Sequence, residues 1–143
     1  MTSAKKHRVL VIDDHIAMQG AMRRLLRNYD VTTCASLAEA RGALASSSFA
    51  AIVSDVELPD GTGLDLLCEL RDSKSAMADR IMFVTGAVHA PLVLAALEAS
   101  GRPFLGKPFS WPALQEFVAA TIEGRRPRGS SMPPRIGGKP PRV

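Results

Sequence analysis

Short apolar runs alternate along the chain with longer segments in which apolar residues recur every three or four positions. Each run is bounded by polar or turn residues, and the runs lie at 9–12, 31–34, 50–54, 81–84 and 104–105. A run that does not alternate between apolar and polar residues is typical of a strand covered on both faces. The run at 31–34 contains two threonines and is less apolar, so we expect this strand to lie nearer an edge of its sheet.

The segments between these runs carry the spacing and the end signals of helices. The first helix is predicted from apolar residues at offsets of 4, 7, 8 and 11, namely Met18, Met22, Leu25, Leu26 and Tyr29. Ser36 and Glu39 have the spacing of a capping box and predict the start of the second helix. The remaining helices are predicted at 64–70, 92–100 and 111–123. Gly101 and Gly124 stand where the last two should end.

Strands that alternate with helices predict a parallel sheet with helices on both faces. Five such units favour the flavodoxin-like, doubly wound α/β fold, with five parallel strands in the order 2-1-3-4-5, five helices and a single domain. The length of 143 residues fits one domain with one core. We expect the domain to cover residues 1–124.

The composition, 46% apolar and 22% charged, is ordinary for a soluble globular protein. The longest apolar stretch, 90–97, contains a proline and is too short to span a bilayer. The basic N-terminus lacks the apolar segment and cleavage site of a signal peptide. Cys34 and Cys68 have no metal-ligand spacing, which favours a buried thiol at each position. These features favour a cytoplasmic protein without membrane association.

The net charge of +4 is unevenly distributed. Residues 1–124 contain 12 Lys/Arg against 14 Asp/Glu, a balance of −2, whereas residues 125–143 contain six basic residues and no acidic one. The second segment is rich in proline and glycine and has few large apolar residues. Such a segment cannot bury enough surface to offset the entropy of ordering its backbone. We therefore expect residues 125–143 to form a basic, disordered tail.

Polar side chains stand at the ends of four predicted strands: Asp13 and Asp14, Asp55, Thr85, and Lys107. The carboxyl ends of parallel strands line the ligand crevice of such a sheet. Three carboxylates there would repel one another unless a cation lies between them, and hard oxygen ligands suit Mg²⁺ or Mn²⁺. Taken singly, each residue could instead be a helix cap, a turn residue or a surface lysine. Their joint placement favours a metal and phosphoryl site.

Four motifs resemble the receiver domain of bacterial response regulators in two-component signalling. They are VIDDH at 11–15, SDVELPDGTG at 54–63, FVTGA at 83–87 and KPF at 107–109. The resemblance covers residues 8 to about 124, essentially the whole expected domain.

The resemblance implies that Asp55 accepts a phosphoryl group from a phosphohistidine of a sensor histidine kinase or phosphotransfer protein. It also implies that Mg²⁺ is held by Asp14, Asp55 and the backbone carbonyl of Glu57, with Asp13 acting through water. Phosphoryl transfer to a carboxylate would form a transient acyl phosphate on the protein rather than a released product. Enzyme activity is uncertain and would extend at most to autophosphorylation from small phosphodonors and autodephosphorylation.

Three further assignments follow from the resemblance. Thr85 and Lys107 would contact the phosphoryl oxygens, and the peptide bond between Lys107 and Pro108 would be cis. Phe104 stands where the family has its switch aromatic, although ordinary strand packing explains this residue equally well. Phosphorylation would alter the surface of the fourth helix, fifth strand and fifth helix for a protein partner. The sequence leaves open the downstream target, the cognate kinase and whether this face forms a homodimer.

Two other functions remain as alternatives. The basic tail could bind nucleic acid or an acidic surface, but it lacks the aromatic residues that stack on bases, which argues against nucleic acid. The domain could also be an unphosphorylated pseudo-receiver that acts as a scaffold. The presence of Asp55, Thr85 and Lys107 argues against that reading. A stand-alone switch is the leading interpretation, and a fragment of a larger hybrid kinase would have the same motifs.

Overall fold

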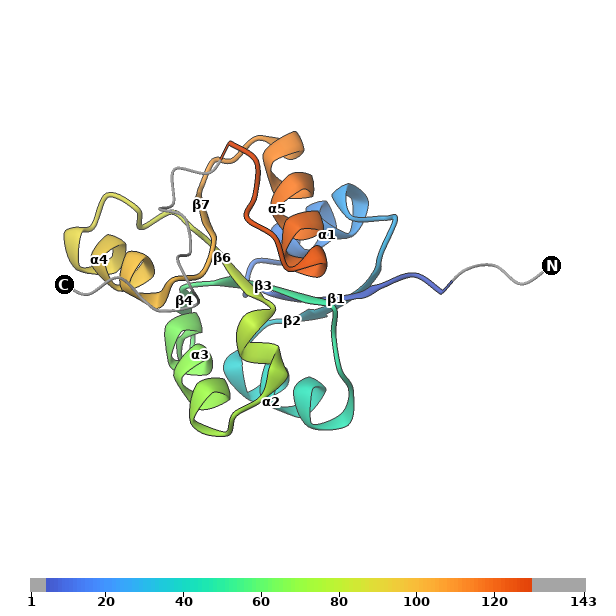
Figure 1. Ribbon diagram of the computed structural model, residues 1–143, viewed down its shortest axis with the longest axis horizontal. Coiled ribbons are helices and arrows are strands. Elements are labelled where there is room, and N and C mark those ends of the chain that lie inside the picture. Colours follow the sequence, from blue (N-terminus) through green and yellow to red (C-terminus); the bar gives the residue numbers. More distant parts are fainter. Residues whose placement is uncertain (1–4, 130–143) are drawn as a thin grey trace.

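The computed structural model describes residues 5–129, which form a central sheet between two layers of helices (Figure 1). All neighbouring strands of this sheet are parallel. Their order is β2-β1-β3-β6-β7. The strands are Arg8–Ile12 (β1), Asp30–Cys34 (β2), Ala51–Asp55 (β3), Ile81–Thr85 (β6) and Phe104–Gly106 (β7). This is the predicted order 2-1-3-4-5, with β7 as the fifth strand of the sheet, and it confirms the predicted fold class.

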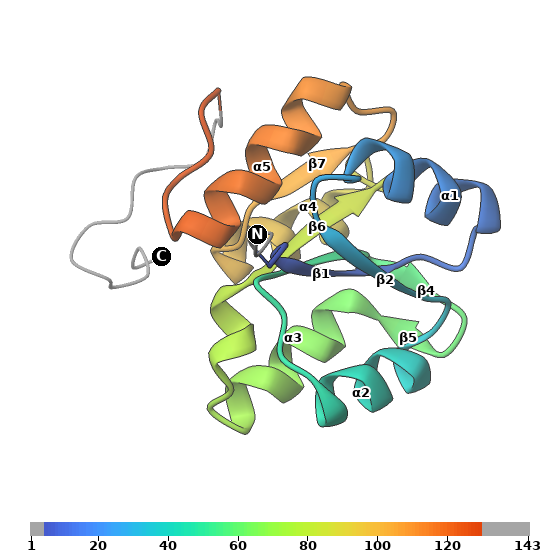
Figure 2. The same ribbon diagram turned by 90° about the vertical axis from the view of Figure 1, so that its right-hand side faces the viewer.

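The helices cover both faces of the sheet (Figure 2). One face carries α1 and α5, and the other carries α2, α3 and α4. The bounds are Ile16–Leu25 (α1), Leu37–Ser46 (α2), Gly63–Asp72 (α3), Pro91–Ser100 (α4) and Trp111–Glu123 (α5). All five predicted helices are therefore present in the described part of the chain.

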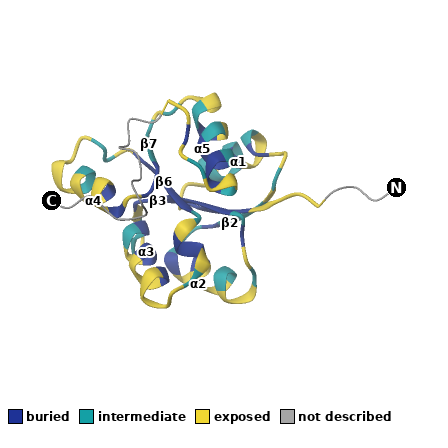
Figure 3. Ribbon diagram, in the orientation of Figure 1, coloured by how far each residue is buried: buried dark blue, intermediate teal, exposed yellow. Residues whose placement is uncertain are grey.

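The core lies in two layers, one on each side of the sheet. In β1, Leu10 and Ile12 pack against the α2 and α3 side, whereas Val9 and Val11 pack against α1 and α5. All four side chains are at most 1% exposed, and the strands form the buried centre of the molecule (Figure 3). Because alternate residues of a strand point to opposite faces, a strand buried on both sides must be apolar throughout.

The predicted helix ends are largely confirmed. Ser36 caps α2 by accepting a hydrogen bond from the Glu39 backbone N–H, while the Glu39 carboxylate accepts from the N–H of residue 35 rather than from Ser36 itself. Gly101 and Gly124 end α4 and α5 with φ angles of 70° and 69°. Glycine adopts this left-handed conformation without the steric cost that other residues meet.

The first helix is shorter than predicted. It ends at Leu25, and Leu26 is its C-cap. Tyr29 lies beyond the helix but still packs against the α1 and α5 side of the core. The apolar periodicity therefore continues past the helix because the following turn also contributes to the core.

The prediction of two buried thiols is correct for Cys34 and wrong for Cys68, which is exposed. The buried stripe of α3 contains Leu67 and Leu70. Cys68 follows Leu67 by one residue, which turns its side chain about 100° around the helix and away from the core.

Two short elements between the main strands and helices were not predicted. A hairpin of Glu57–Leu58 (β4) and Gly61–Thr62 (β5) follows β3, and a single 3₁₀ turn, Ala76–Asp79, precedes β6. Asp60, at the tip of the hairpin, accepts hydrogen bonds from the backbone N–H groups of Leu37 and Ala38 at 2.8 and 3.0 Å. These bonds lower the pKa of Asp60 and make it a second cap for α2.

The segment after Gly124 differs in part from the expected tail. Residues 125–129 pack against α5 instead of leaving the domain, and Pro127 is buried. The remainder of the tail, 130–143, and residues 1–4 lie outside the described residues. Among the helices that the structure describes, none is long and apolar enough to cross a membrane.

Candidate functional site

The predicted site residues lie together at the carboxyl edge of the sheet. Asp13 directly follows β1, and Asp55 and Thr85 are the last residues of β3 and β6. Lys107 follows β7, and its backbone N–H donates to the carbonyl of Thr85 at 2.8 Å. The parallel register places Asp55 opposite Val84 on β6. Four strands thus deliver their terminal residues to one edge, as the sequence predicts.

Lys107 forms the centre of the site because it joins two carboxylates. Its Nζ donates to Asp13 Oδ2 and to Asp55 Oδ2, each at 3.0 Å. Asp13 and Asp55 are only 3% and 8% exposed. Burial alone would lower the pKa of Lys107, but the hydrogen bonds and negative charges of the two aspartates outweigh it and raise the pKa above the ordinary value. The ammonium therefore stays charged at neutral pH and offsets the repulsion between the two acids.

His15 is a member of the cluster that the sequence reasoning did not assign. Its Nδ1 lies 3.1 Å from Asp13 Oδ1 and 3.2 Å from Asp14 Oδ1. Its backbone N–H also donates to Asp13 Oδ1 at 2.8 Å. The side chains of His15 and Asp14 are more accessible than that of Asp13, with 71% and 37% exposed against 4%. The position of His15 immediately after two acids was the available signal.

The donor set fits a divalent cation. Asp13, Asp14, His15 and Asp55 each offer a ligand atom, and these atoms lie within 4.8 Å of one another. Three of the four are carboxylates, which supply the hard oxygen ligands that Mg²⁺ prefers. The backbone N–H of Glu57 donates to Asp55 Oδ1 at 3.3 Å, which keeps residue 57 beside the same carboxylate.

Thr85 ends β6 and lies opposite Gly106, whereas Phe104 is the first residue of β7, and the contacts of both residues are local. The Thr85 hydroxyl accepts a hydrogen bond from the backbone N–H of Ala87 at 3.0 Å. Phe104 is opposite Phe83 in the sheet and packs against the α2 and α3 side of the core. The bond between Lys107 and Pro108 is cis, as the resemblance implies.

Gly63, the last residue of the SDVELPDGTG motif, lies directly behind the site. A Cβ at this position would lie 2.5 Å from the backbone oxygen of Asp55 and 2.6 Å from Ser54 Oγ. The Ser54 hydroxyl donates to the same Asp55 oxygen at 2.8 Å. The absence of a side chain therefore allows the start of α3 to pack directly on the end of β3, next to Asp55.

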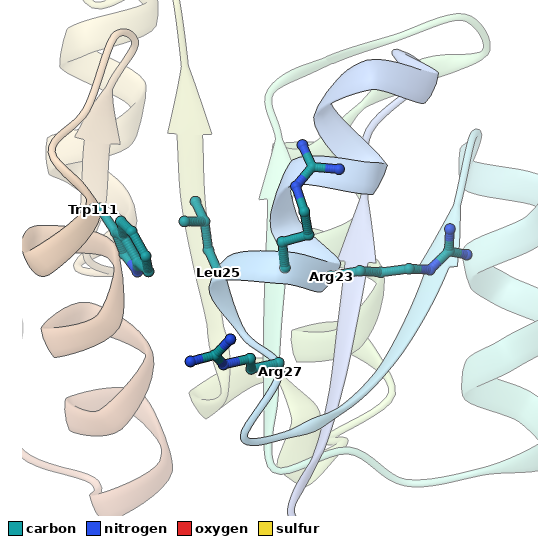
Figure 4. Close-up of a pocket in the computed structure, with 5 residues that line it drawn as sticks. Arg23, Leu25, Arg27 and Trp111 are labelled. Atoms are coloured by element: carbon teal, nitrogen blue, oxygen red, sulfur yellow. The ribbon is translucent and has the colours of Figure 1, made fainter.

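A separate pocket of about 540 Å³ opens between the end of α1 and the start of α5 (Figure 4). Its lining residues are Arg23, Arg24, Leu25, Arg27 and Trp111. None of the predicted site residues lines this pocket. Arg23 is directed away from Trp111 and donates to Thr33 Oγ1 on β2.

Lys107→Met is expected to lower the free energy of unfolding by roughly 2 kcal/mol at pH 7 without divalent ions, because it leaves two largely buried carboxylates without their ammonium. The pKa of Lys107 is raised on folding, so its stabilisation is complete below the unfolded-state pKa. It is lost as the pH rises through the folded-state pKa. Urea unfolding measures the difference.

Lys5→Met is the matched control, because this substitution removes the same charge at an exposed position. We expect it to change the free energy of unfolding by less than about 0.5 kcal/mol. Equal stability of the two variants would show that the bridge does not stabilise the fold.

Comparison with known proteins places the chain in a family. Residues 9–119 match the response regulator receiver domain. The transcriptional regulatory protein FixJ of Bradyrhizobium diazoefficiens is 30% identical over 128 residues, covering 88% of this chain and 62% of that protein. The chemotaxis protein CheY of Pseudomonas aeruginosa is 27% identical, and the match covers 81% of this chain and 96% of that protein. The chain thus spans less than two thirds of the FixJ relative but nearly all of the CheY relative.

Solved structures agree with these relatives. Full-length FixJ from B. japonicum superimposes with a TM-score of 0.73 at 31% identity, covering 84% of this chain and 59% of that one. CheY4 of Vibrio cholerae gives a TM-score of 0.72 at 26% identity, covering 82% of this chain and 99% of that one. The family is one of phosphorylation-based signalling, and its members bind Mg²⁺ at an acidic pocket. The match over residues 9–119, together with the acidic edge joined by Lys107, means that the chain belongs to the response regulator receiver domain family.

Proposed function

We propose that this protein is a phosphoacceptor switch in which Asp55 takes a phosphoryl group from a phosphohistidine of a sensor histidine kinase or phosphotransfer protein. The observation that carries the proposal is the bridge from Lys107 Nζ to Asp55 Oδ2 and Asp13 Oδ2, beside the carboxylate of Asp14. It combines a carboxylate, a fixed positive charge and a cation-binding donor set at one sheet edge. The proposed location is the cytoplasm.

The phosphoryl transfer needs a nucleophile and a neutralising environment. A carboxylate oxygen of Asp55 forms a bond to phosphorus as the phosphorus–nitrogen bond of the donor breaks. The donor imidazole leaves with the bonding electron pair and takes up a proton. Lys107, already 3.0 Å from Asp55, offsets the charge of the phosphoryl oxygens. The Thr85 oxygen accepts from Ala87, which leaves the hydroxyl proton free to be donated to a phosphoryl oxygen.

The proposed metal ligands are Asp14, Asp55 and the backbone carbonyl of Glu57, with Asp13 acting through water. Bound Mg²⁺ would neutralise the charge shared by the carboxylate and the phosphoryl group. The His15 imidazole has its Nδ1 3.1 Å from Asp13 Oδ1 and 3.2 Å from Asp14 Oδ1, so it lies beside the proposed metal ligands.

The proposed output is a changed surface on α4, β7 and α5. Thr85 and Phe104 would couple the site to this surface, because they lie on the paired strands β6 and β7. Thr85 is opposite Gly106, and Phe104 is opposite Phe83. A protein partner, or a second copy of the chain, would recognise the phosphorylated form of the surface.

Incubation with acetyl phosphate and Mg²⁺, followed by intact mass measurement, tests the proposal. We expect a gain equal to one phosphoryl group, which chelation of Mg²⁺ strongly reduces. A protein that gains no mass under conditions that phosphorylate a reference receiver domain would refute the phosphoacceptor function.

Glu57 places a further carboxylate next to the proposed metal site, and its side chain is exposed. We expect Glu57→Gln to weaken Mg²⁺ binding about threefold at low ionic strength, because it removes one nearby negative charge. Calorimetric titration with Mg²⁺ measures the change. Asp72→Asn, which removes an equal charge at the end of α3, should leave the affinity unchanged, and equal affinities of the two variants would contradict the expectation.

A further inference from the structure

The imidazole of His15 has neither of the two usual structural roles of a histidine at this position. His15 is the N-cap residue of α1, but its side chain forms no capping hydrogen bond. It also does not pack in the core, because 71% of the side chain is exposed. Its Nδ1 instead faces two carboxylates, at 3.1 Å from Asp13 Oδ1 and 3.2 Å from Asp14 Oδ1. The ring therefore belongs to the acidic site rather than to the helix.

The position of His15 is fixed by bonds that tie it to Asp13 and to the first turn of α1. Its backbone N–H donates to Asp13 Oδ1 at 2.8 Å. Its carbonyl accepts from the backbone N–H of Gln19 at 3.0 Å, and Gln19 Nε2 donates to the carbonyl of Asp13 at 2.7 Å. These bonds hold the backbone of His15 relative to the acids, so its ring nitrogen is held close to their oxygens before any ion binds.

The oxygens of Asp13 are divided between two cationic or nitrogen groups. Lys107 Nζ takes Oδ2 of Asp13 and Oδ2 of Asp55, whereas His15 lies at Oδ1 of Asp13. A metal ion is repelled by the ammonium, so we expect it on the side of the imidazole. This side is also the accessible one, because the side chains of His15 and Asp14 are 71% and 37% exposed. An ion can reach it directly from solvent.

The separations between the donor atoms match those between the ligands of one small ion. Neighbouring ligands are about 3.0 Å apart around an octahedral ion with bonds of about 2.1 Å, and about 3.3 Å apart around tetrahedral Zn²⁺. The two distances from His15 Nδ1, 3.1 and 3.2 Å, lie in this range. Asp55 completes the set, and all four donor atoms lie within 4.8 Å of one another.

The nitrogen changes which ions such a site prefers. A neutral imidazole with its proton on Nε2 presents a lone pair on Nδ1. Carboxylate oxygens alone suit Mg²⁺, whereas an imidazole nitrogen suits Zn²⁺ and other first-row transition ions. The affinity of mixed nitrogen and oxygen sites for these ions also exceeds what oxygen ligands alone provide. His15 is therefore the residue through which this site can distinguish Zn²⁺ from Mg²⁺.

We propose that His15 is a direct metal ligand, and that together with Asp14 and Asp55 it binds a borderline transition-metal ion such as Zn²⁺ in competition with Mg²⁺. This inference rests on the proposed function, because it concerns the metal site of the same switch. A transition ion held by His15 occupies the carboxylates that Mg²⁺ needs. Phosphorylation of Asp55 then depends on the supply of transition metal as well as on the phosphodonor.

Co²⁺, a spectroscopic substitute for Zn²⁺, tests the proposal in the full-length protein without an affinity tag. In the proton NMR spectrum, Co²⁺ should shift the carbon-bound ring protons of His15 out of the diamagnetic range, while those of His7 stay within it. Calorimetry should show that excess Mg²⁺ weakens the apparent affinity for Co²⁺, because both ions need Asp14 and Asp55.

His15→Asn replaces the ring nitrogen by an amide oxygen, and asparagine is a preferred N-cap residue, so α1 should persist. We expect the affinity for Co²⁺ to fall at least about tenfold. The affinity for Mg²⁺ should change less than about threefold, because Mg²⁺ accepts the oxygen readily. His7→Asn is the matched control and should leave both affinities unchanged, since His7 is exposed and precedes β1 at the opposite edge of the sheet.

Three results would overturn the proposal: equal Co²⁺ affinities of His15→Asn and the unaltered protein, a parallel fall of the Mg²⁺ affinity, or Co²⁺ binding that excess Mg²⁺ does not weaken. Phosphorylation by acetyl phosphate and Mg²⁺ is measured on samples free of Co²⁺ and reads Asp55 independently. Ligation of Co²⁺ by His15 without phosphorylation would refute only the phosphoacceptor function. Phosphorylation without such ligation would refute only the role of His15.

Discussion

Asp55→Asn is expected to abolish the phosphoryl adduct, so that the intact mass stays constant after incubation with acetyl phosphate and Mg²⁺. An amide oxygen is not a nucleophile toward phosphorus under these conditions, and we expect the rate of modification to fall at least about 100-fold. The substitution preserves the size of the side chain and an oxygen that can accept from Lys107, so the fold should persist. Circular dichroism and urea unfolding verify that the variant is folded.

The neighbouring carboxylates make this a specific test. Asp13 is buried and its two oxygens already accept from Lys107 and His15, whereas Asp14 is accessible. If acetyl phosphate still modified the Asp55→Asn variant, peptide mapping would identify the acceptor, and the role of Asp55 would be wrong. Asp72→Asn should gain a phosphoryl group as the unaltered protein does.

Gly63→Ala is expected to lower the free energy of unfolding by roughly 3 kcal/mol. The added Cβ would lie 2.5 Å from the backbone oxygen of Asp55, and the clash cannot be relieved by rotating a flexible side chain. Either α3 or the end of β3 must move. We therefore also expect slower phosphorylation of Asp55, because the substitution displaces its backbone.

Gly42→Ala provides the control for Gly63→Ala. Gly42 lies within α2, and a Cβ there would meet no atom within 4 Å. Replacing a glycine inside a helix by alanine stabilises a protein by up to about 1 kcal/mol. Urea unfolding should therefore move the two variants in opposite directions. Equal stability of both would show that the close approach of α3 to Asp55 is not maintained in solution.

The fold was accessible from the sequence because buried parallel strands impose a simple pattern. β1, β3 and β6 are covered on both faces, so each is an almost uninterrupted apolar run. The carboxyl ends of such strands meet at one edge of the sheet. Because Asp13, Asp55 and Lys107 follow or end strands, the sequence also predicted that they would lie together. Helix ends were predictable where Gly101 and Gly124 mark them. Local sequence and global topology agree in these elements.

The remaining features depend on contacts that have no local pattern. The close packing at Gly63 arises only when α3 lies on β3, and no local sequence pattern indicates it. The capping of α2 by Asp60 joins residues 23 positions apart across the hairpin. The hydrogen bonds from Arg125 and Arg128 to Glu116 require a chain reversal at Gly124. Composition alone assigned residues 125–143 to a disordered tail. Cys68 was predicted to be buried because cysteine is an apolar residue type, but burial depends on which side of the helix the residue occupies.

The bridge formed by Lys107 gives the domain an internal counter-ion. Its ammonium balances Asp13 and Asp55 from within the chain, so removal of divalent ions does not leave these two acids facing each other alone. We therefore expect the domain to stay folded in buffers that chelate divalent ions. Under the proposed function, metal binding would then be a separate event from folding.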